Sequence, residues 1–81
     1  MLRRRNREPV RMERKRFAFL PEAFTWRGCR YLVHTVERCW TQARGSGERR
    51  VERRYFRVQC DGGRFELCHD IVANTWCVRA G

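Results

Sequence analysis

The chain has 81 residues and a formal net charge of +10, which limits it to one small domain with a modest core. It contains no apolar run of about 18 residues or more, and no apolar segment follows its arginine-rich start, so we expect neither a membrane span nor a secretory signal. The prediction is a cytoplasmic protein that does not bind a membrane.

Arginine supplies almost all of the positive charge, which lies mainly in two stretches. Residues 1–16 hold eight basic side chains against two glutamates, and residues 44–54 hold five against two, so nine of the ten net charges fall there. The first stretch is poor in apolar side chains and contains Pro9, which is typical of disorder, and aromatic residues begin at Phe17. We therefore predict a basic flexible arm over residues 1–16 and a single small β domain over residues 17–81.

The first elements of the domain are two strands. A short strand over residues 24–26 leads into a turn at Gly28, and a longer strand over residues 30–37 is dense in β-branched and aromatic side chains. Apolar residues also recur at helical spacing over residues 36–43, so one short helical turn there is an alternative. Residues 44–54 have the glycines and charges of a loop.

A β-hairpin is the clearest local signal. Residues 55–60 and 64–69 alternate apolar with polar side chains on either side of Asp61-Gly62-Gly63. A two-residue loop at Gly62-Gly63 opposes Cys60 to Phe65, Val58 to Leu67 and Phe56 to His69, which puts the apolar groups on one face. A loop one residue longer would invert one strand, so the even loop is predicted.

A last strand is expected over residues 75–79, with Trp76 and Val78 facing the same way. Five short strands with closely spaced turns predict an all-β fold, a small five-stranded antiparallel barrel or strongly bent sheet of the SH3-like or OB-like kind.

The five cysteines and two histidines do not indicate a catalytic or metal site. No C-x-x-C pair is present, and the odd number of cysteines argues against a disulfide framework, so free thiols are expected. Cys68 and His69 are neighbours on a strand and point to opposite faces. No paired-carboxylate, Ser/His/Asp or phosphate-loop pattern occurs, and we predict no catalytic residue, no cofactor and no metal ligand.

Basic side chains interleaved with aromatic ones favour a nucleic acid, DNA or RNA, as the partner. Arginines of the arm and loop neutralise phosphates, and rings beside arginines offer surfaces for base stacking. The candidate nucleic-acid-binding residues are Arg3, Arg4, Arg5, Arg7, Arg11, Arg14, Lys15, Arg16, Arg49, Arg50, Arg53, Arg54, Trp26, Arg27 and Tyr55.

A family resemblance covers about three quarters of the chain. The residues that carry it are Pro21, Phe24, Trp26-Arg27-Gly28, Tyr31, Val33, Trp40, Arg54-Tyr55-Phe56-Arg57-Val58, Gly63, Phe65-Glu66-Leu67, Asp70 and Trp76. In this order they resemble a family of short uncharacterised bacterial proteins, which also resembles the C-terminal appendage of some Y-family translesion DNA polymerases. The resemblance implies a non-catalytic module in DNA repair or damage tolerance, with a polymerase or repair factor as protein partner. The cysteines and the arginine-rich arm lie outside the resembling pattern.

Two other functions compete with nucleic-acid binding. The first is a protein–protein interaction module that uses an aromatic groove or a sheet edge, with the arm as a solubilising or docking tail. The second is a metal-stabilised, cysteine-rich domain. The sequence leaves open DNA or RNA, single or double strand, and the oligomeric state.

Overall fold

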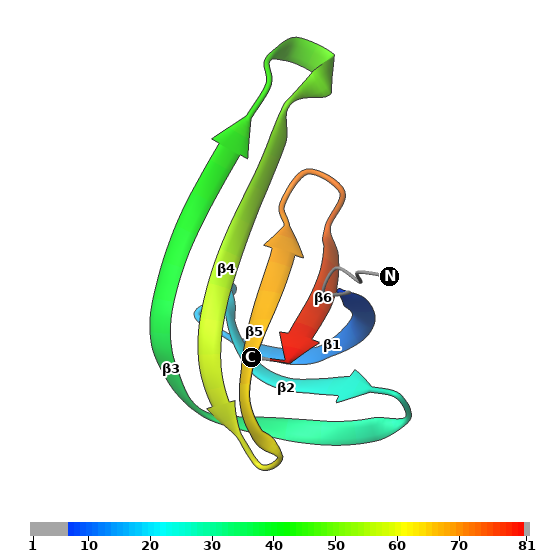
Figure 1. The fold of residues 1–81 in the computed structure, drawn as a ribbon, viewed down its shortest axis with the longest axis vertical. Helices are drawn as coiled ribbons and strands as arrows, with labels where there is room; N and C mark the ends of the chain where they lie inside the picture. The colour runs from blue at the N-terminus through cyan, green and yellow to red at the C-terminus, as the bar shows by residue number, and fades with distance from the viewer. Residues whose placement is uncertain (1–6, 81) are drawn as a thin grey trace, which may run out of the picture.

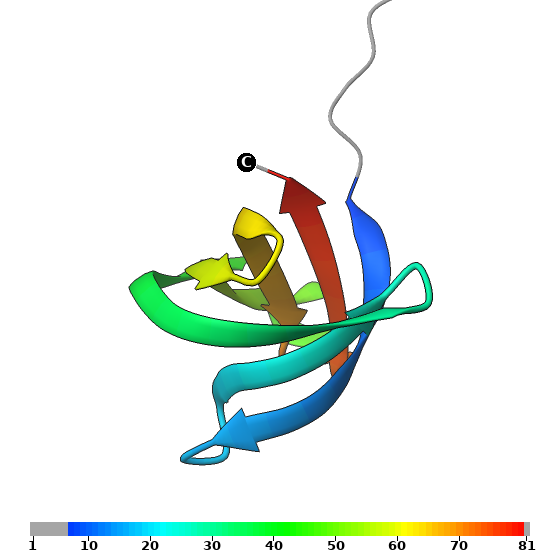
Figure 2. The same cartoon turned by 90° about the horizontal axis from the view of Figure 1, so that it is seen from below.

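The chain folds into six antiparallel strands that close into a barrel (Figure 1). A computed structural model describes residues 7–80. The elements in these residues are β1 (Glu8–Arg16), β2 (Leu20–Trp26), β3 (Cys29–Arg44), a single 3-10 turn η1 (Gly47–Arg49), β4 (Val51–Cys60), β5 (Gly63–Asp70) and β6 (Thr75–Ala80). Each strand pairs with the next along the chain, and β1 also pairs with β6, which closes the barrel (Figure 2). No helix in these residues is long and apolar enough to cross a membrane.

The expected small all-β barrel is confirmed, but it has six strands in these residues rather than five. The additional strand is β1, so the predicted flexible arm is wrong for Glu8–Arg16, and residues 1–6 lie outside the described residues. Val10 and Met12 pack against the core from β1, whereas Arg11 and Glu13 are exposed between and beside them. This alternation is that of a half-buried strand, although only two apolar side chains carry it.

The turn between β1 and β2 hides this hairpin from sequence inspection. Its central residues, Phe17 and Ala18, have φ of 54° and 67°, and the Phe19 N–H donates to the Arg16 carbonyl oxygen at 3.2 Å. Two consecutive positive φ angles are the requirement of a type I′ hairpin turn, which normally selects glycine or asparagine. Because neither is present here, the composition gives no turn signal.

β3 is much longer than the predicted strand, and the alternative of a helical turn over residues 36–43 is wrong. Register shifts between Val33 and Thr35 and between Val36 and Arg38 mark bulges, which let a long strand bend around a barrel. Beyond the bend, β3 and β4 continue together as a two-stranded ribbon that projects from the barrel at the top of Figure 1. The predicted loop shrinks accordingly, because β3 ends at Arg44 and β4 begins at Val51.

The β4–β5 hairpin has a two-residue loop as predicted, but the loop begins one residue earlier and the pairing register is shifted by two residues. Cys60 pairs with Gly63 and Val58 with Phe65, so Asp61-Gly62 is the two-residue loop. A Cβ atom on Gly62 would lie 2.8 Å from the Tyr31 ring, so glycine leaves room for that ring. The predicted pairs Cys60–Phe65, Val58–Leu67 and Phe56–His69 are therefore wrong. A shift of two residues keeps every side chain on its predicted face.

The core lies between the sheet of β3–β6 and the crossing strands β1 and β2. Its largest fully buried side chains are Phe24, Phe56, Val58, Leu67 and Val78. The Trp76 ring stacks on Phe56 at a centroid distance of 5.6 Å and on His69 at 4.2 Å. The indole therefore contacts two other rings inside the barrel and is only 7% exposed.

Candidate nucleic-acid interface

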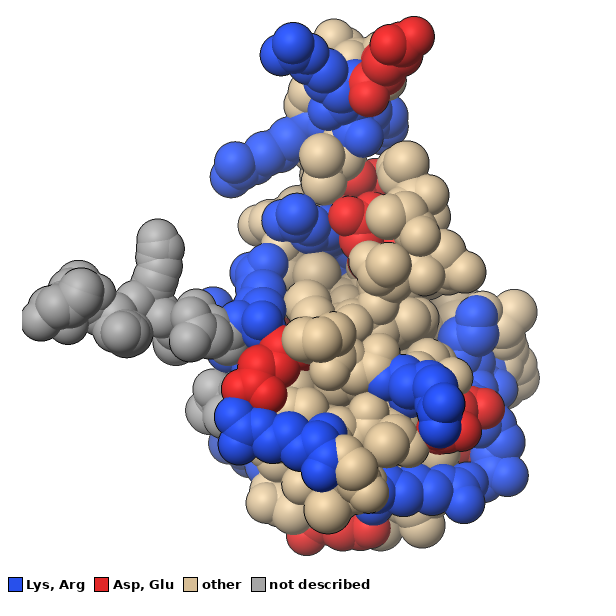
Figure 3. Space-filling model, turned by 90° about the vertical axis from the view of Figure 1, so that its right-hand side faces the viewer, with Lys and Arg blue, Asp and Glu red and all other residues tan. Residues whose placement is uncertain are grey.

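Three of the four basic side chains of β1 form ion pairs with carboxylates. Arg11 pairs with Glu13 at 3.1 Å, and Arg14 and Arg16 both pair with Glu22 of β2, at 3.1 and 3.0 Å. Lys15 has no ion pair within residues 7–80. The other predicted positions of the arm, Arg3, Arg4 and Arg5, lie outside the described residues. On the side of the molecule drawn in Figure 3, blue side chains accordingly lie next to red ones over much of the barrel.

Trp26 and Arg27 are also held by a carboxylate. Glu8 accepts a hydrogen bond from Trp26 Nε1 at 2.9 Å and another from Arg27 Nε at 2.8 Å, and Arg27 also forms an ion pair with it. The hydrogen bonds from Arg27 and from Trp26 lower the pKa of the Glu8 carboxyl, so its charge persists into acid. The Arg27 guanidinium lies 5.0 Å from the Trp26 ring centroid. The polar groups of Trp26 and Arg27 are thus already bound to a carboxylate of the same chain.

The predicted residues of the loop separate into different environments. Arg49 is in η1 and Arg50 lies 3.6 Å from Glu52, both at the projecting end of the ribbon. Arg54 lies over the Phe19 ring at 5.1 Å, on the face of β4 opposite to Arg53. The loop arginines therefore do not form one surface.

Strand register brings a different set of arginines together. Arg38 is paired with Arg57, Trp40 with Tyr55, and Gln42 with Arg53, all on one face of β3 and β4. The same face continues across β5 and β6 through Glu66 with Arg79 and Asp70 with Thr75. Together with Arg7, which precedes β1, this surface is called the outer arginine face. Its members are Arg7, Arg38, Trp40, Arg44, Arg53, Tyr55, Arg57 and Arg79.

The middle of this face is a row in which two stacked rings lie between two arginines. The Arg38 guanidinium lies 4.9 Å from the Trp40 ring centroid, and Trp40 stacks on Tyr55 at 5.4 Å with an interplanar angle of 18°. Arg7 lies over Tyr55 at 5.5 Å. Tyr55 is only 6% exposed and offers no open ring, whereas Trp40 is half-buried. Trp40 is therefore the more accessible ring of this pair.

The outer arginine face carries an excess of positive charge. Arg79 donates to both oxygens of Glu66, at 3.0 and 2.9 Å, and Arg53 lies 4.0 Å from Asp70. The other four arginines of the face, Arg7, Arg38, Arg44 and Arg57, form no ion pair within residues 7–80. Like charges directly opposite each other, as at Arg38 and Arg57, destabilise a sheet. An anion bound between these arginines would therefore reduce their mutual repulsion.

A hollow of about 200 Å³ opens on this face. It is lined by Arg7, Gln42, Arg44, Val51, Arg53 and Tyr55. Three guanidinium groups and an amide at one hollow supply the donor types that bind phosphate oxygens. The hollow and the neighbouring Trp40 ring together offer contacts to both the phosphate and the base of a nucleotide.

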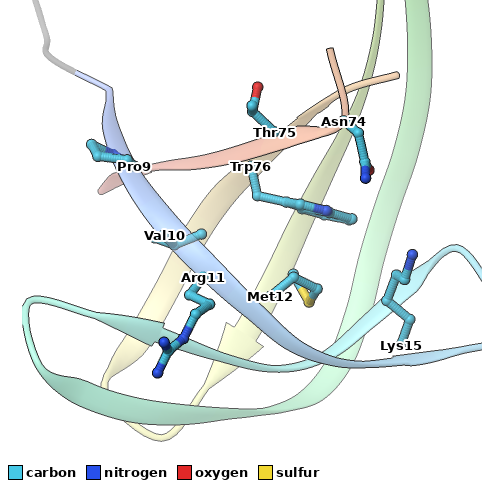
Figure 4. Close-up of a pocket in the computed structure, with 8 residues that line it drawn as sticks. All are labelled: Pro9, Val10, Arg11, Met12, Lys15, Asn74, Thr75 and Trp76. Atoms are coloured by element: carbon cyan, nitrogen blue, oxygen red, sulfur yellow. The ribbon is translucent and has the colours of Figure 1, made fainter. Parts of the chain in front are cut away.

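A larger hollow, of about 430 Å³, lies beside β1 at the start of β6 (Figure 4). Met12, Lys15, Asn74 and Trp76 point toward one space there, whereas Arg11 points away from it. Trp76 lines this space but is only 7% exposed, and its ring already stacks on Phe56 and His69. The hollow therefore lacks an open ring for stacking, although it has one cationic side chain in Lys15.

The cysteines are free thiols in the described part of the chain, and no three His, Cys, Asp or Glu side chains come together there as a metal site. Cys29 and Cys39 are exposed, Cys60 and Cys68 are buried, and Cys77 is half-buried. Burial, and secondarily the charge of Asp61, raise the pKa of the Cys60 thiol to about 11. That thiol is therefore inert at neutral pH.

The sequence prediction included Arg7, Arg53 and Tyr55 but missed Arg79 and, on β3 and β4, Arg38, Trp40, Arg44 and Arg57. A signal for them exists, because Arg38, Trp40, Gln42 and Arg44 alternate at the spacing of a strand, as do Arg53, Tyr55 and Arg57. A helical turn over residues 36–43 would break that alternation, and a loop over residues 44–54 would leave the two runs unpaired. Those two expectations therefore concealed the shared face.

Fold and surface together define a small closed β-barrel with a projecting two-stranded ribbon and an arginine–aromatic outer face. The chain belongs to the family described as Domain of unknown function (DUF6504), whose match covers residues 2–80. No curated protein and no solved structure matches the chain. Membership of an uncharacterised domain family is thereby confirmed, whereas the likeness to polymerase appendages stays a prediction. Because the match begins at residue 2, the arginine-rich start lies inside the family's domain.

Proposed function

We propose that this protein is a non-catalytic nucleic-acid-binding accessory module whose outer arginine face holds a single strand. One observation carries the proposal: four arginines without a carboxylate partner surround the stacked Trp40–Tyr55 pair. Arginine contacts to phosphates supply affinity, and a ring beside them accepts a base by stacking. Of the arginines proposed from the arm and loop, the proposal keeps Arg7 and Arg53. It adds Arg38, Arg44 and Arg57 from β3 and β4.

The dimensions of the face suit an extended strand. Alternate residues on a β-strand are about 7 Å apart, so the span from Arg38 to Arg44 runs for roughly 20 Å. Trp40 lies near its middle, and the hollow lined by Arg7, Arg44 and Arg53 lies beside it. Phosphates along the arginines and one base on Trp40 would engage the whole row at once.

A link to DNA repair or damage tolerance, with a polymerase or repair factor as protein partner, rests on the resemblance alone. A cytoplasmic location agrees with such a partner and rests on the composition. Both belong to the proposal.

A protein-interaction role is the second candidate, and the edge of β3 favours it. β2 pairs with β3 at residues 29–32, and from Val33 onward the described residues pair with β3 only on the β4 side. An edge of this kind accepts an added strand through its backbone N–H and C=O groups. Binding of a protein partner through that edge would survive the loss of arginine side chains.

The double variant R38Q/R57Q tests the proposed function. We expect its affinity for a single-stranded oligonucleotide to fall about tenfold or more at low salt, because two charge-assisted phosphate contacts are lost. Four phosphate contacts predict a slope of roughly −3 for the logarithm of the association constant against that of salt concentration, and the variant reduces its magnitude by about 1.4. Fluorescence anisotropy over a salt series measures both quantities.

The matched control is K15Q/R30Q, which removes the same charge from two side chains outside the outer arginine face. Neither side chain forms an ion pair within residues 7–80. Equal losses in the two double variants would mean that only net charge matters, and no binding by the unaltered protein at low salt would refute the proposed function.

Trp40→Leu separates stacking from charge. Leucine keeps apolar cover over Tyr55 but removes the half-buried indole ring, so we expect a loss of about 1–3 kcal/mol in binding free energy with an unchanged salt slope. Isothermal titration calorimetry with single-stranded oligonucleotides measures the affinity. If the unaltered protein binds a strand with all its bases no more tightly than a strand of abasic positions, no base stacks on Trp40.

A further inference from the structure

Two cysteines face each other on the outer side of the sheet. Cys68 of β5 and Cys77 of β6 are direct cross-strand partners, and both are free thiols. Directly opposed residues in an antiparallel pair have Cα atoms about 4.5–5.5 Å apart, which falls within the range of about 4.4–6.8 Å found in disulfides. A bond between the two sulfurs therefore requires no rearrangement of the strands.

The pair opens into a hollow of about 150 Å³. Arg7, Arg53, Asp70 and Thr75 line it together with the two cysteines. Cys68 is 4% exposed, whereas Cys77 is half-buried, so a reagent in the hollow reaches Cys77 first. Two guanidinium groups against one carboxylate make the entrance attractive to anions.

The two thiols differ in acidity. The hydrogen bond from Cys68 lowers the pKa of Cys77 to about 7, helped by the charges of Arg7 and Arg53 and opposed by burial and by Asp70. The same hydrogen bond, with burial, raises the pKa of Cys68. These charged groups come from the segment before β1, from β4 and from β5, and the Tyr55 ring on β4 packs beside Cys68. Near neutral pH the pair thus contains one attacking thiolate and one thiol held in reserve.

We propose that Cys68 and Cys77 form a reversible dithiol–disulfide site that exchanges with anionic low-molecular-weight disulfides, of which oxidised glutathione is an example. The Cys77 thiolate attacks one sulfur of the reagent, the reagent's S–S bond breaks, and the first reagent thiolate leaves and takes a proton from water. Cys68 then attacks the Cys77 sulfur, the bond between Cys77 and the reagent breaks, and the second reagent group leaves as a thiolate that takes up the proton lost by Cys68. Two electrons pass from the protein to the reagent, and one protein disulfide and two reduced thiols result.

The arrangement differs from that of the other cysteines. Cys60 is buried with a raised pKa, and Cys29 and Cys39 are exposed without a cysteine as their strand partner. Only the pair on β5 and β6 combines an accessible thiolate with a second sulfur opposite it in the described residues. This inference stands apart from the proposed function, because it requires no nucleic acid.

The test uses the full chain with C29S/C39S, which removes the two exposed thiols. We expect the reduced protein, equilibrated with mixtures of oxidised and reduced glutathione and trapped in acid, to lose two hydrogens and release two reduced thiols per chain. Peptide mass spectrometry should then find Cys68 joined to Cys77. Adding C68S should stop the reaction at a single glutathione adduct on Cys77, and C77S should slow it about tenfold or more, because the remaining thiol is mostly protonated.

Two further measurements examine the role of the arginines and of pH. The rate of the first step should rise with pH and reach half of its maximum near pH 7, because the reacting form is the Cys77 thiolate. Arg7→Gln should lower the preference for oxidised glutathione over the uncharged hydroxyethyl disulfide by roughly threefold, since it removes attraction for the anion. K15Q/R30Q, with its substitutions outside the hollow, should keep the preference of the unaltered chain.

Several outcomes would overturn the inference. These are a glutathione adduct on Cys77 that persists without release of the second thiol, a disulfide that instead includes Cys60, and a folded protein whose Cys77 reacts no faster than Cys60. Each variant is first shown to melt cooperatively, and C77A replaces C77S if the serine prevents folding, so that the comparison of rates is still made on a folded chain.

Discussion

Deletion of residues 1–16 is expected to abolish cooperative folding. β1 lies within the deleted stretch, pairs with both β2 and β6, and covers the core with Val10 and Met12. Its loss exposes two strand edges and part of the core, an effect comparable to the whole stability of a chain of this size, about 4–12 kcal/mol. Urea denaturation followed by tryptophan fluorescence and circular dichroism measures it.

The control for this deletion keeps the strand and removes only its positive charge. Replacing Arg11, Arg14, Lys15 and Arg16 together by glutamine should leave a cooperative transition within about 2 kcal/mol of the original, because exposed ion pairs contribute about 0–1 kcal/mol each. A deletion variant that unfolds at the unaltered urea midpoint would mean that the segment is a dispensable tail after all.

Phe56→Ala should cost about 3–5 kcal/mol of unfolding free energy. Phe56 is fully buried on β4, stacks on Trp76 at 5.6 Å, and belongs to the cluster that fills the barrel. Truncation removes the transfer free energy of the ring and leaves a cavity that the closed sheet can relax into only in part. The urea midpoint, with an unchanged dependence of free energy on urea, reports the loss.

Val72→Ala provides the surface comparison. Val72 is 64% exposed in the turn between β5 and β6, so we expect its truncation to change stability by less than about 0.5 kcal/mol. A loss below about 1 kcal/mol for Phe56→Ala would contradict the position of this ring at the centre of the core.

Local pattern indicated most of the C-terminal half of the fold. The alternation over residues 55–60 and 64–69 and the Asp61-Gly62-Gly63 turn predicted a hairpin, its even loop and the face that enters the core. The shift of the pairing register by two residues could not be predicted from the local sequence, because both registers bury the same side chains. In the observed register, the Tyr31 ring of β3 lies close to Gly62, which is a contact between segments distant in the sequence.

The N-terminal half depended on tertiary contacts. β1 has only Val10 and Met12 to mark its inner face, and its turn at Phe17-Ala18 lacks the residues that normally announce a type I′ turn. The composition of this segment resembles that of a disordered one, and pairing with β2 and β6 makes it a strand. Only in the closed barrel are its backbone groups hydrogen-bonded on both sides and its two apolar side chains packed against the core.

The candidate site divides in the same way. Composition established the positive charge, and the order of residues established the arginines beside aromatic residues and, through alternation and turn spacing, the expectation of an all-β domain. The position of that charge was decided by the fold, because Glu13 and Glu22 form ion pairs with the arginines of β1, while strand register sets Arg38 opposite Arg57 and Trp40 opposite Tyr55. Charge is a sum over residues and can be read from the sequence, whereas a binding face requires knowing which strands lie side by side and in which register.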